Sequence, residues 1–273
     1  MITPHFSIII PTLDEEKYLP KLLDDLRKQK EHNFEVLIID CSSQDKTINV
    51  AEKYRKLLTL KIFKKEKKNV SLQRNYGAKK AKGEYLIFLD ADSRVTDSFT
   101  KNLKKVALKR KGLVFIPHIV PDESFARSIF KIINFLVELS QNTNTPFSTG
   151  GSMIWDRCFF LKIKGFNEKL YVAEDHNIIK KAAEWGVKAK FLPQIKIRFS
   201  LRRMKKEGRL TLFYKLILIT AHILIKGDVR DKIVEYEMGG ARYKNLKKPS
   251  FEENLRSNIE QINQFFKKYL FES

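Results

Sequence analysis

The sequence predicts an α/β protein built on a doubly wound, mostly parallel β-sheet with flanking helices, followed by a helical C-terminal appendage. Two observations lead to this fold class. Short, continuous apolar runs alternate with amphipathic segments up to about residue 120, and such runs are typical of strands buried on both faces. The alternation itself implies βαβ crossovers, which place successive strands parallel in one sheet.

The first half of the chain supplies four predicted strands, at residues 6–11, 34–40, 60–63 and 84–90. A leucine face predicts a helix after the first strand, and Pro20 fits this helix only within its first turn. We expect Ser43 or Asp45 to cap the second helix and Ser71 to cap the third, because short polar side chains accept hydrogen bonds from free N–H groups there.

The second half continues with less regular elements. An amphipathic helix is expected at 124–139, a turn-rich loop at 142–151 and a short strand at 153–155. A helix at 174–185 should stop at Gly186, followed by strands at 187–191 and 195–199. Beyond Ser200 the pattern becomes helical and basic, so we place one domain at residues 1–200 and a basic helical segment at 201–273.

The composition restricts the classes of partner. The 273 residues carry 53 Lys and Arg against 32 Asp and Glu, a formal net charge of +21. This balance favours anionic partners such as nucleotide phosphates, nucleic acid or an anionic membrane. The alternative is a lysine-rich surface spread over solvated faces. Aromatic residues are not interleaved with the basic runs as a stacking platform requires, which argues against a nucleic-acid partner.

The remaining composition limits compartment and class. With 43% apolar residues the chain can bury a core, which excludes disorder over most of its length. Two cysteines are too few for a disulfide framework or a zinc site, so we expect a reducing compartment. We expect neither a signal peptide nor a spanning helix, since Asp14 to Glu16 interrupt the first apolar run and no stretch reaches about 18 apolar residues.

Carboxylates end two of the predicted strands. Asp40 could accept hydrogen bonds from a base or a ribose. Asp90 and Asp92 could together face Mg²⁺ or Mn²⁺ that also binds phosphate oxygens; the alternative is a solvated turn. Arg74, on the helix before Asp90, could reach a diphosphate or lie on the surface.

Two further motifs lie later in the chain. Gly150 and Gly151 precede a strand, where glycine allows a ligand to approach the backbone, or simply forms a turn. Glu174 and Asp175 open a helix. The helix dipole favours carboxylates there, but one of them could also remove a proton from a hydroxyl group.

Five segments in order resemble family 2 glycosyltransferases with the GT-A fold, a Rossmann-like α/β fold, over about residues 5–200. They are SIIIPTLDEE, IIDCSSQDKT, RNYGAKKAKGEYLIFLDADS, TGGSMIWDRCFFLKIKGFNE and the later ED. The resemblance implies transfer of a sugar from a nucleoside diphosphate sugar, most often a uridine one, with inversion at the anomeric carbon. An Mn²⁺ or Mg²⁺ cofactor is implied with it.

The resemblance also implies roles for individual residues. Asp175 would be the catalytic base, supported by Glu174, and Gly151 would lie beside the sugar and the acceptor. Asp90 and Asp92 would contact the donor ribose and the metal. The implied nucleotide-sugar-binding residues, including the later arginine pair, are Pro11, Thr12, Glu15, Asp40, Arg74, Asp90, Ala91, Asp92, Gly151, Arg202 and Arg203.

The sequence departs from the family pattern at several positions. Asp14 and Cys41 stand where family members often carry Asn and a second Asp, which leaves the donor open. The absence of a QxxRW motif after the ED argues against a processive polysaccharide synthase. His176 could be a further metal ligand or a packed imidazole.

The C-terminal segment suggests attachment to a membrane or to protein. Arg202 and Arg203 could clamp the leaving diphosphate or face anionic lipid. Residues 210–226 predict a helix with a wide apolar surface and a narrow polar stripe, which could lie in a membrane interface or pack in a dimer. We therefore expect a cytoplasmic protein, peripheral on the inner face of the membrane if the first alternative holds.

The acceptor and the rival functions follow from the same residues. A lipid phosphate is already ionised and needs no base, so the ED pair favours a hydroxyl acceptor on a lipid-linked or cell-envelope glycan. The rival classes are a nucleotidyltransferase on a similar fold, in which Asp175 has no evident role, and a non-enzymatic basic module that binds nucleic acid. The intact DAD and ED motifs argue against an inactive family member.

Overall fold

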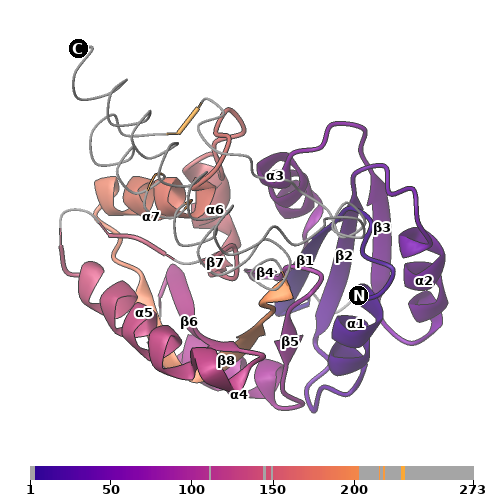
Figure 1. Cartoon of the computed structure of the whole chain (residues 1–273), viewed down its shortest axis with the longest axis horizontal. Coiled ribbons are helices and arrows are strands. Elements are labelled where there is room, and N and C mark those ends of the chain that lie inside the picture. Colours follow the sequence, from indigo (N-terminus) through magenta and orange to yellow (C-terminus); the bar gives the residue numbers. More distant parts are fainter. Residues whose placement is uncertain are drawn as a thin grey trace, which may run out of the picture. The chain divides into compact units, whose positions relative to one another are not determined.

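A computed structural model describes residues 4–110, 112–143, 146–148 and 150–202, together with residues 215, 218, 229 and 230 (Figure 1). The predicted fold class is confirmed. One sheet of eight strands, ordered β3-β2-β1-β4-β7-β6-β8-β5, has helices on both faces. The chain divides into two compact units. The first holds this sheet and runs to Glu168, then from Glu174 to Ser200.

Four parallel strands form the first half of the sheet and confirm the predicted βαβ crossovers. They alternate with helices in the order β1 (Phe6–Thr12), α1 (Leu19–Arg27), β2 (Phe34–Asp40), α2 (Thr47–Lys53), η1 (Tyr54–Lys56), β3 (Leu60–Lys64), α3 (Val70–Lys80) and β4 (Tyr85–Phe88). Strand β1 lies between β2 and β4, so the winding direction of the chain reverses beside it. Open α/β sheets bind ligands at the carboxyl ends of strands at such a reversal.

The second half of the sheet mixes strand directions. Its elements are β5 (Arg94–Val95), α4 (Phe99–Arg110), β6 (Val114–Pro121), η2 (Ser124–Ala126), α5 (Arg127–Ser140), β7 (Ile154–Asp156), α6 (Arg157–Lys162), α7 (Glu174–Glu184) and β8 (Lys190–Phe199). Strand β7 runs antiparallel to β4 and β6, while β8 runs parallel to β6. The two strands predicted at 187–191 and 195–199 are therefore one strand, β8, whose register with β6 shifts between Pro117 and His118.

Two apolar cores hold the helices against the sheet. One joins α1, α2 and α4 to the first face, for example through Leu22 and Leu103 packed with Ile8. The other joins α3, α5, α6 and α7 to the opposite face, for example through Phe160 and Ile178. Each face of the central strands is thus covered, which is why their apolar runs are continuous.

The helix ends confirm some predictions and correct two, both for N-caps. Pro20 lies in the first turn of α1, and Gly186 follows α7 with a φ of 74°, as a helix stop requires. The cap of α3 is Asn69, whose Oδ1 accepts from Leu72 N at 2.8 Å, so the expectation for Ser71 was wrong. Asn69 has an extended backbone, whereas Ser71 already lies inside the helix. The N-cap position of α2 is Lys46, which makes no side-chain cap hydrogen bond, so the expectation that Ser43 or Asp45 occupies it was also wrong. Asp45, one residue earlier, still accepts from Thr47 N at 2.9 Å.

The second unit comprises residues 169–173 and most of the chain after residue 200. Within it, Tyr171 N donates to Val229 O at 2.9 Å. The helices predicted around 210–226 and 251–262 lie outside the described residues, except for Lys215 and Leu218. The domain boundary at residue 200 stays a prediction. Within the part that the structure describes, no helix combines the length and apolar character needed to cross a bilayer.

Candidate active site

The carboxyl ends of β1 and β2 are joined through Asp40, whose side chain is fully buried. Asp40 Oδ1 accepts from Thr12 Oγ1 at 2.9 Å and from Ser43 Oγ at 2.5 Å, and its Oδ2 accepts from Ser43 N at 3.0 Å. These donors satisfy the carboxylate, whose burial without hydrogen-bond partners would cost free energy. Asp40 and Thr12 are therefore held together, as their predicted membership of one pocket requires.

The loops that follow β1 and β2 are tied to each other by side-chain to backbone hydrogen bonds. Asp14 Oδ1 accepts from Gln44 N at 2.7 Å, and Thr47 Oγ1 accepts from Glu15 N at 2.7 Å. Asp14 and Ser42 adopt left-handed backbone conformations, with φ of 56° and 57°. Asp tolerates this conformation better than most residues, so it suits position 14.

Helix α3 presents three consecutive buried polar residues to the site, beside the small residues that pack on the sheet. Gln73 Nε2 donates to Thr12 O at 2.9 Å and to Ile39 O at 2.6 Å, so it bridges the ends of β1 and β2. Asn75 binds the backbone of Phe166 through both its amide oxygen and its amide nitrogen, each at 2.9 Å. Sequence reasoning missed Gln73; the signal available was a run of polar residues in a helix that must cover the sheet.

Arg74 is the central residue of this trio and is only 3% exposed. Its Nη2 lies 2.8 Å from Asp90 Oδ1, and its Nη1 lies 2.8 Å from Glu174 Oε1. Burial lowers the pKa of Arg74, but the two carboxylates outweigh this effect and hold the pKa above its usual value. The guanidinium therefore stays charged and links the end of β4 to the start of α7.

Gly151 lies against this guanidinium. A Cβ built on Gly151 would fall 1.7 Å from Arg74 Nη2 and 2.2 Å from Arg74 Cζ. Only glycine allows the backbone and the arginine to approach so closely. The residue expected beside the sugar and the acceptor thus has a defined task in the structure, which is to leave room for Arg74.

The carboxylates of the ED pair begin helix α7. Glu174 binds Arg74, and burial raises the pKa of Glu174 although the guanidinium opposes the shift. Asp175 is 8% exposed, and its Oδ1 accepts from His176 N at 3.0 Å. Ala173, directly before the helix, has a φ of 64°. Backbone strain of this kind concentrates at functional sites because the surroundings must hold it in place.

A divalent cation was implied for Asp90 and Asp92. Asp90 is about one-third exposed and follows β4, and Asp92 is half-buried two residues later. Among the described residues no group of three His, Cys, Asp or Glu side chains could hold a metal by itself. Mg²⁺ and related ions usually combine one or two carboxylates with substrate phosphate oxygens. The pair therefore fits a cation that binds together with a diphosphate.

His176, the further candidate ligand, packs its ring on Phe147. The two rings are parallel to within 14°, with centroids 5.8 Å apart. Its Nε2 lies 4.0 Å from Asp175 Oδ1. A stacked imidazole beside a carboxylate agrees with the packed alternative that the sequence left open.

The other predicted residues are placed as follows. Pro11 lies in β1 opposite Ile39, and Glu15 and Ala91 are buried near the strand ends. Arg202 belongs to the second unit, and Arg203 lies outside the described residues.

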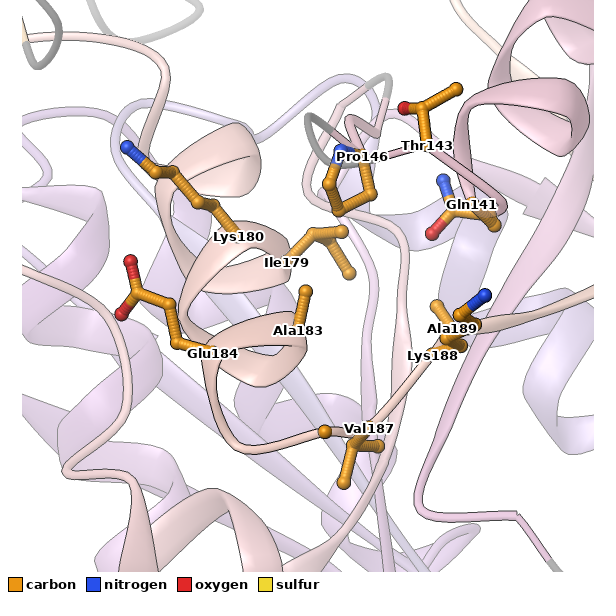
Figure 2. Close-up of a pocket in the computed structure, with 11 residues that line it drawn as sticks. Gln141, Thr143, Pro146, Ile179, Lys180, Ala183, Glu184, Val187, Lys188 and Ala189 are labelled. Atoms are coloured by element: carbon orange, nitrogen blue, oxygen red, sulfur yellow. The ribbon is translucent and has the colours of Figure 1, made fainter.

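A hollow of about 290 Å³ lies beside the C-terminal half of α7 (Figure 2). Its walls include Gln141, Pro146, Ile179 and Val187, and none of the predicted site residues lines it. The hollow is therefore separate from the cluster built around Arg74.

Comparison with known proteins identifies relatives of this chain. The family model described as glycosyl transferase family 2 matches residues 7–163. The poly(ribitol-phosphate) β-N-acetylglucosaminyltransferase TarS of Staphylococcus aureus is 38% identical over 101 residues, which are 36% of this chain and 18% of TarS. A dolichyl N-acetyl-α-D-glucosaminyl phosphate 3-β-D-2,3-diacetamido-2,3-dideoxy-β-D-glucuronosyltransferase of Methanococcus voltae is 34% identical over 161 residues, 55% of this chain and 47% of that protein. The match thus spans less than half the length of these two relatives.

Solved structures show the same fold at lower identity. TarS residues 1–349 in complex with UDP-GlcNAc aligns with a TM-score of 0.59 and 22% identity, covering 97% of this chain and 81% of that one. The mannosyltransferase PcManGT of Pyrobaculum calidifontis, in complex with GDP-Man and Mn²⁺, aligns with a TM-score of 0.64 and 17% identity, covering 97% and 70%. The predicted GT-A architecture is thereby confirmed.

Proposed function

The chain belongs to glycosyl transferase family 2, and we propose that it moves a sugar from a nucleoside diphosphate donor to a hydroxyl group of a cell-envelope or lipid-linked glycan. One observation carries the proposal. Arg74 joins Asp90, at the strand end where donors bind in such folds, to Glu174, the neighbour of the proposed base. A single buried guanidinium thus connects the proposed donor-binding strand end with the helix that carries the proposed base.

Asp175 acts as the general base in this proposal. It removes the proton from the acceptor hydroxyl while that oxygen attacks the anomeric carbon from the face opposite the diphosphate. The bond between the anomeric carbon and the diphosphate breaks in the same step, so the configuration inverts. Asp175 lies in the first turn of α7, where the helix dipole favours negative charge.

The donor side is formed by the strand ends. Asp40, together with Pro11, Thr12 and Glu15, receives the nucleoside, and uridine is the proposed nucleoside. Asp90 and Asp92 would hold Mn²⁺ or Mg²⁺ together with the diphosphate, and the cation would neutralise charge on the leaving group.

Arg74 is enclosed and already bound to two carboxylates, so we assign it the positioning of Asp90 and Glu174. The proposed diphosphate clamp by Arg202 and Arg203 needs its own test, because Arg202 belongs to the second unit and Arg203 lies outside the described residues.

The names of the relatives support the substrate class. TarS acts on poly(ribitol-phosphate), and the Methanococcus voltae enzyme acts on a dolichyl-linked sugar. The structural neighbours bind UDP-GlcNAc and GDP-Man. These names favour a nucleotide-sugar donor and a glycan acceptor. Our proposal places the enzyme in the cytoplasm at the inner face of the membrane, as the sequence led us to expect.

Donor binding is tested first by thermal stabilisation with a panel of nucleoside diphosphates, with Mn²⁺ and then with a chelator. A ligand at 100 times its dissociation constant should stabilise the fold by about 2.7 kcal/mol. One diphosphate should raise the melting temperature, and the chelator should remove the effect. If only nucleoside triphosphates or RNA stabilise the protein, the transferase proposal fails.

The base is tested separately with Asp175→Asn. This variant should bind the diphosphate nearly as the parent does and lose transfer, because the amide cannot accept the hydroxyl proton. Asp97→Asn, which changes an exposed aspartate outside the cluster, is the matched control and should keep full activity. Normal turnover by Asp175→Asn would remove Asp175 from the proposed role.

A further inference from the structure

Helix α5 carries a row of large apolar side chains that face away from the core. At 100° per residue, those within the helix fall in an arc of about 120°, opposite the buried Phe130, Asn134 and Val137. We call this row the α5 ridge, and it consists of Phe125, at the helix entrance, and Ile129, Ile132, Phe135, Leu136 and Leu139.

The exposure of the α5 ridge is too large to be incidental. Ile132 and Phe135 are 60% and 62% exposed, and Ile129 is 59% exposed. Single exposed apolar residues are ordinary, but a contiguous row marks a surface for a partner or a membrane. The ridge is convex and about 20 Å long, as 14 helical residues require. A convex ridge of this length can be accommodated by a broad surface that deforms around it.

Charged groups around the α5 ridge identify the occupant. Arg127 and Lys131 are exposed along one flank, where Glu138 is the opposing charge. At the C-terminal end, Gln141 directly follows α5 and shares the walls of the hollow with Lys180, Lys188 and Glu184 (Figure 2). Cations outnumber anions at this C-terminal end, whereas Asp122 and Glu123 precede Phe125 at the helix entrance. A basic region beside an apolar helix face is typical of helices that lie in anionic membrane interfaces.

Trp185 adds an aromatic anchor at the same end. It stands in the chain between Glu184 and Gly186, which both line the hollow, and its side chain is 52% exposed. Lys162 Nζ lies 5.0 Å from the centroid of its ring. Amphipathic aromatic rings flanked by lysine are enriched where protein meets lipid headgroups. A second copy of this chain is a poorer occupant, because each copy carries a formal charge of +21 and like charges repel.

We propose that the α5 ridge docks the enzyme on an anionic lipid bilayer, with Trp185 and the adjacent lysines at the headgroup level. Only the benefit of this docking rests on the proposed function: docking would bring the candidate active site to a lipid-linked acceptor. The chain leaves α5 through Gln141, whose Nε2 donates to Phe147 O at 2.7 Å, and Phe147 stacks on His176 beside Asp175. The end of α5 is thus connected to the proposed base through the contacts of Gln141 with Phe147 and of Phe147 with His176.

The test measures binding of the full chain to vesicles of phosphatidylcholine with phosphatidylglycerol, and to vesicles of phosphatidylcholine alone. Ile132→Gln/Phe135→Gln removes apolar area without changing charge and should weaken binding to the anionic vesicles at least tenfold. Arg127→Gln/Lys131→Gln should weaken it less, and its effect should vanish in high salt. Leu57→Gln, at a residue 55% exposed outside α5, is the matched control and should bind as the parent does.

Two outcomes would overturn the inference. One is unchanged vesicle binding by Ile132→Gln/Phe135→Gln, which would assign any membrane contact to other residues. The other is a change of that variant from dimer to monomer or a large drop in its melting temperature, which would show that protein covers the ridge. Donor stabilisation by a nucleoside diphosphate should be the same in all these variants. Its loss in the parent would count against the proposed function and leave the membrane result standing.

Discussion

The close approach of Gly151 to Arg74 yields a prediction with a worked magnitude. In Gly151→Ala the new Cβ would lie 1.7 Å from Arg74 Nη2, so the two atoms must separate by about 1.7 Å to reach an ordinary contact of 3.4 Å. A shift of that size in the guanidinium breaks the 2.8 Å contacts to Asp90 and Glu174. Breaking a buried ion pair costs about 3 kcal/mol or more, and misplacing a catalytic group by about 1 Å can lower the rate about 100-fold.

A double-mutant cycle read by urea unfolding isolates this effect. Arg74→Ala removes the atoms that the new methyl group would meet, so Gly151→Ala should cost less than about 0.5 kcal/mol in that background. Gly150→Ala is the matched control. It has a φ of 72° and its nearest contact is 3.4 Å from Phe199, so its backbone strain should be the same with or without Arg74. If the costs of Gly151→Ala and Arg74→Ala simply add, the reasoning about their contact is refuted.

Three further predictions use other parts of the molecule. Asp92→Asn should lower diphosphate affinity measured with Mn²⁺ about tenfold or more and leave melting of the free protein unchanged, whereas equal affinity would remove Asp92 from the cation site. An aromatic disulfide reagent should modify Cys158, which is exposed, before unfolding, and Cys41 only after unfolding, because Cys41 is buried and burial raises its pKa. His118 has a pKa below 6.5, chiefly from burial and then from Lys196, so the unfolded chain binds the proton better and stability should fall as the pH drops through 6.5. Urea unfolding should show a smaller loss for His118→Phe, and an identical loss in both proteins would contradict this.

The fold was largely predictable because its first half obeys simple rules. Buried parallel strands gave continuous apolar runs, and β2 begins and ends where the runs indicated, at Phe34 and Asp40. The second half was harder. Strand β6 contains Pro117 and Pro121, and proline is unfavourable in a strand interior, so its run did not indicate a strand. Strand β5 has only two residues, and no pattern of period two can be recognised over that length.

The site was predictable in its carboxylates and less so in its supporting contacts. Asp40, Asp90 and Asp175 could be placed because they follow strands or open a helix. The contacts of Arg74 could not, since Glu174 is 100 residues away in the sequence and the ion pair exists only after folding. Gln73 was missed for a related reason. A buried polar residue in a helix looks like a surface residue until its partners, the carbonyls of Thr12 and Ile39, are known.

The charges of the site explain why its donor should depend on a cation although the whole chain is strongly positive. The proposed residues contribute six carboxylates, Glu15, Asp40, Asp90, Asp92, Glu174 and Asp175, and the first unit contributes one arginine, Arg74. That arginine already neutralises parts of two carboxylates, because both terminal nitrogens of Arg74 are bound. A diphosphate entering between Asp90 and Asp92 brings further negative charge, and like charges at short range repel strongly in a partly buried site. A cation that binds the diphosphate and these two carboxylates together reverses the sign of this interaction. The net charge of +21 can then raise the local concentration of the anionic donor and of anionic lipid, while we expect binding at the site itself to depend on the metal.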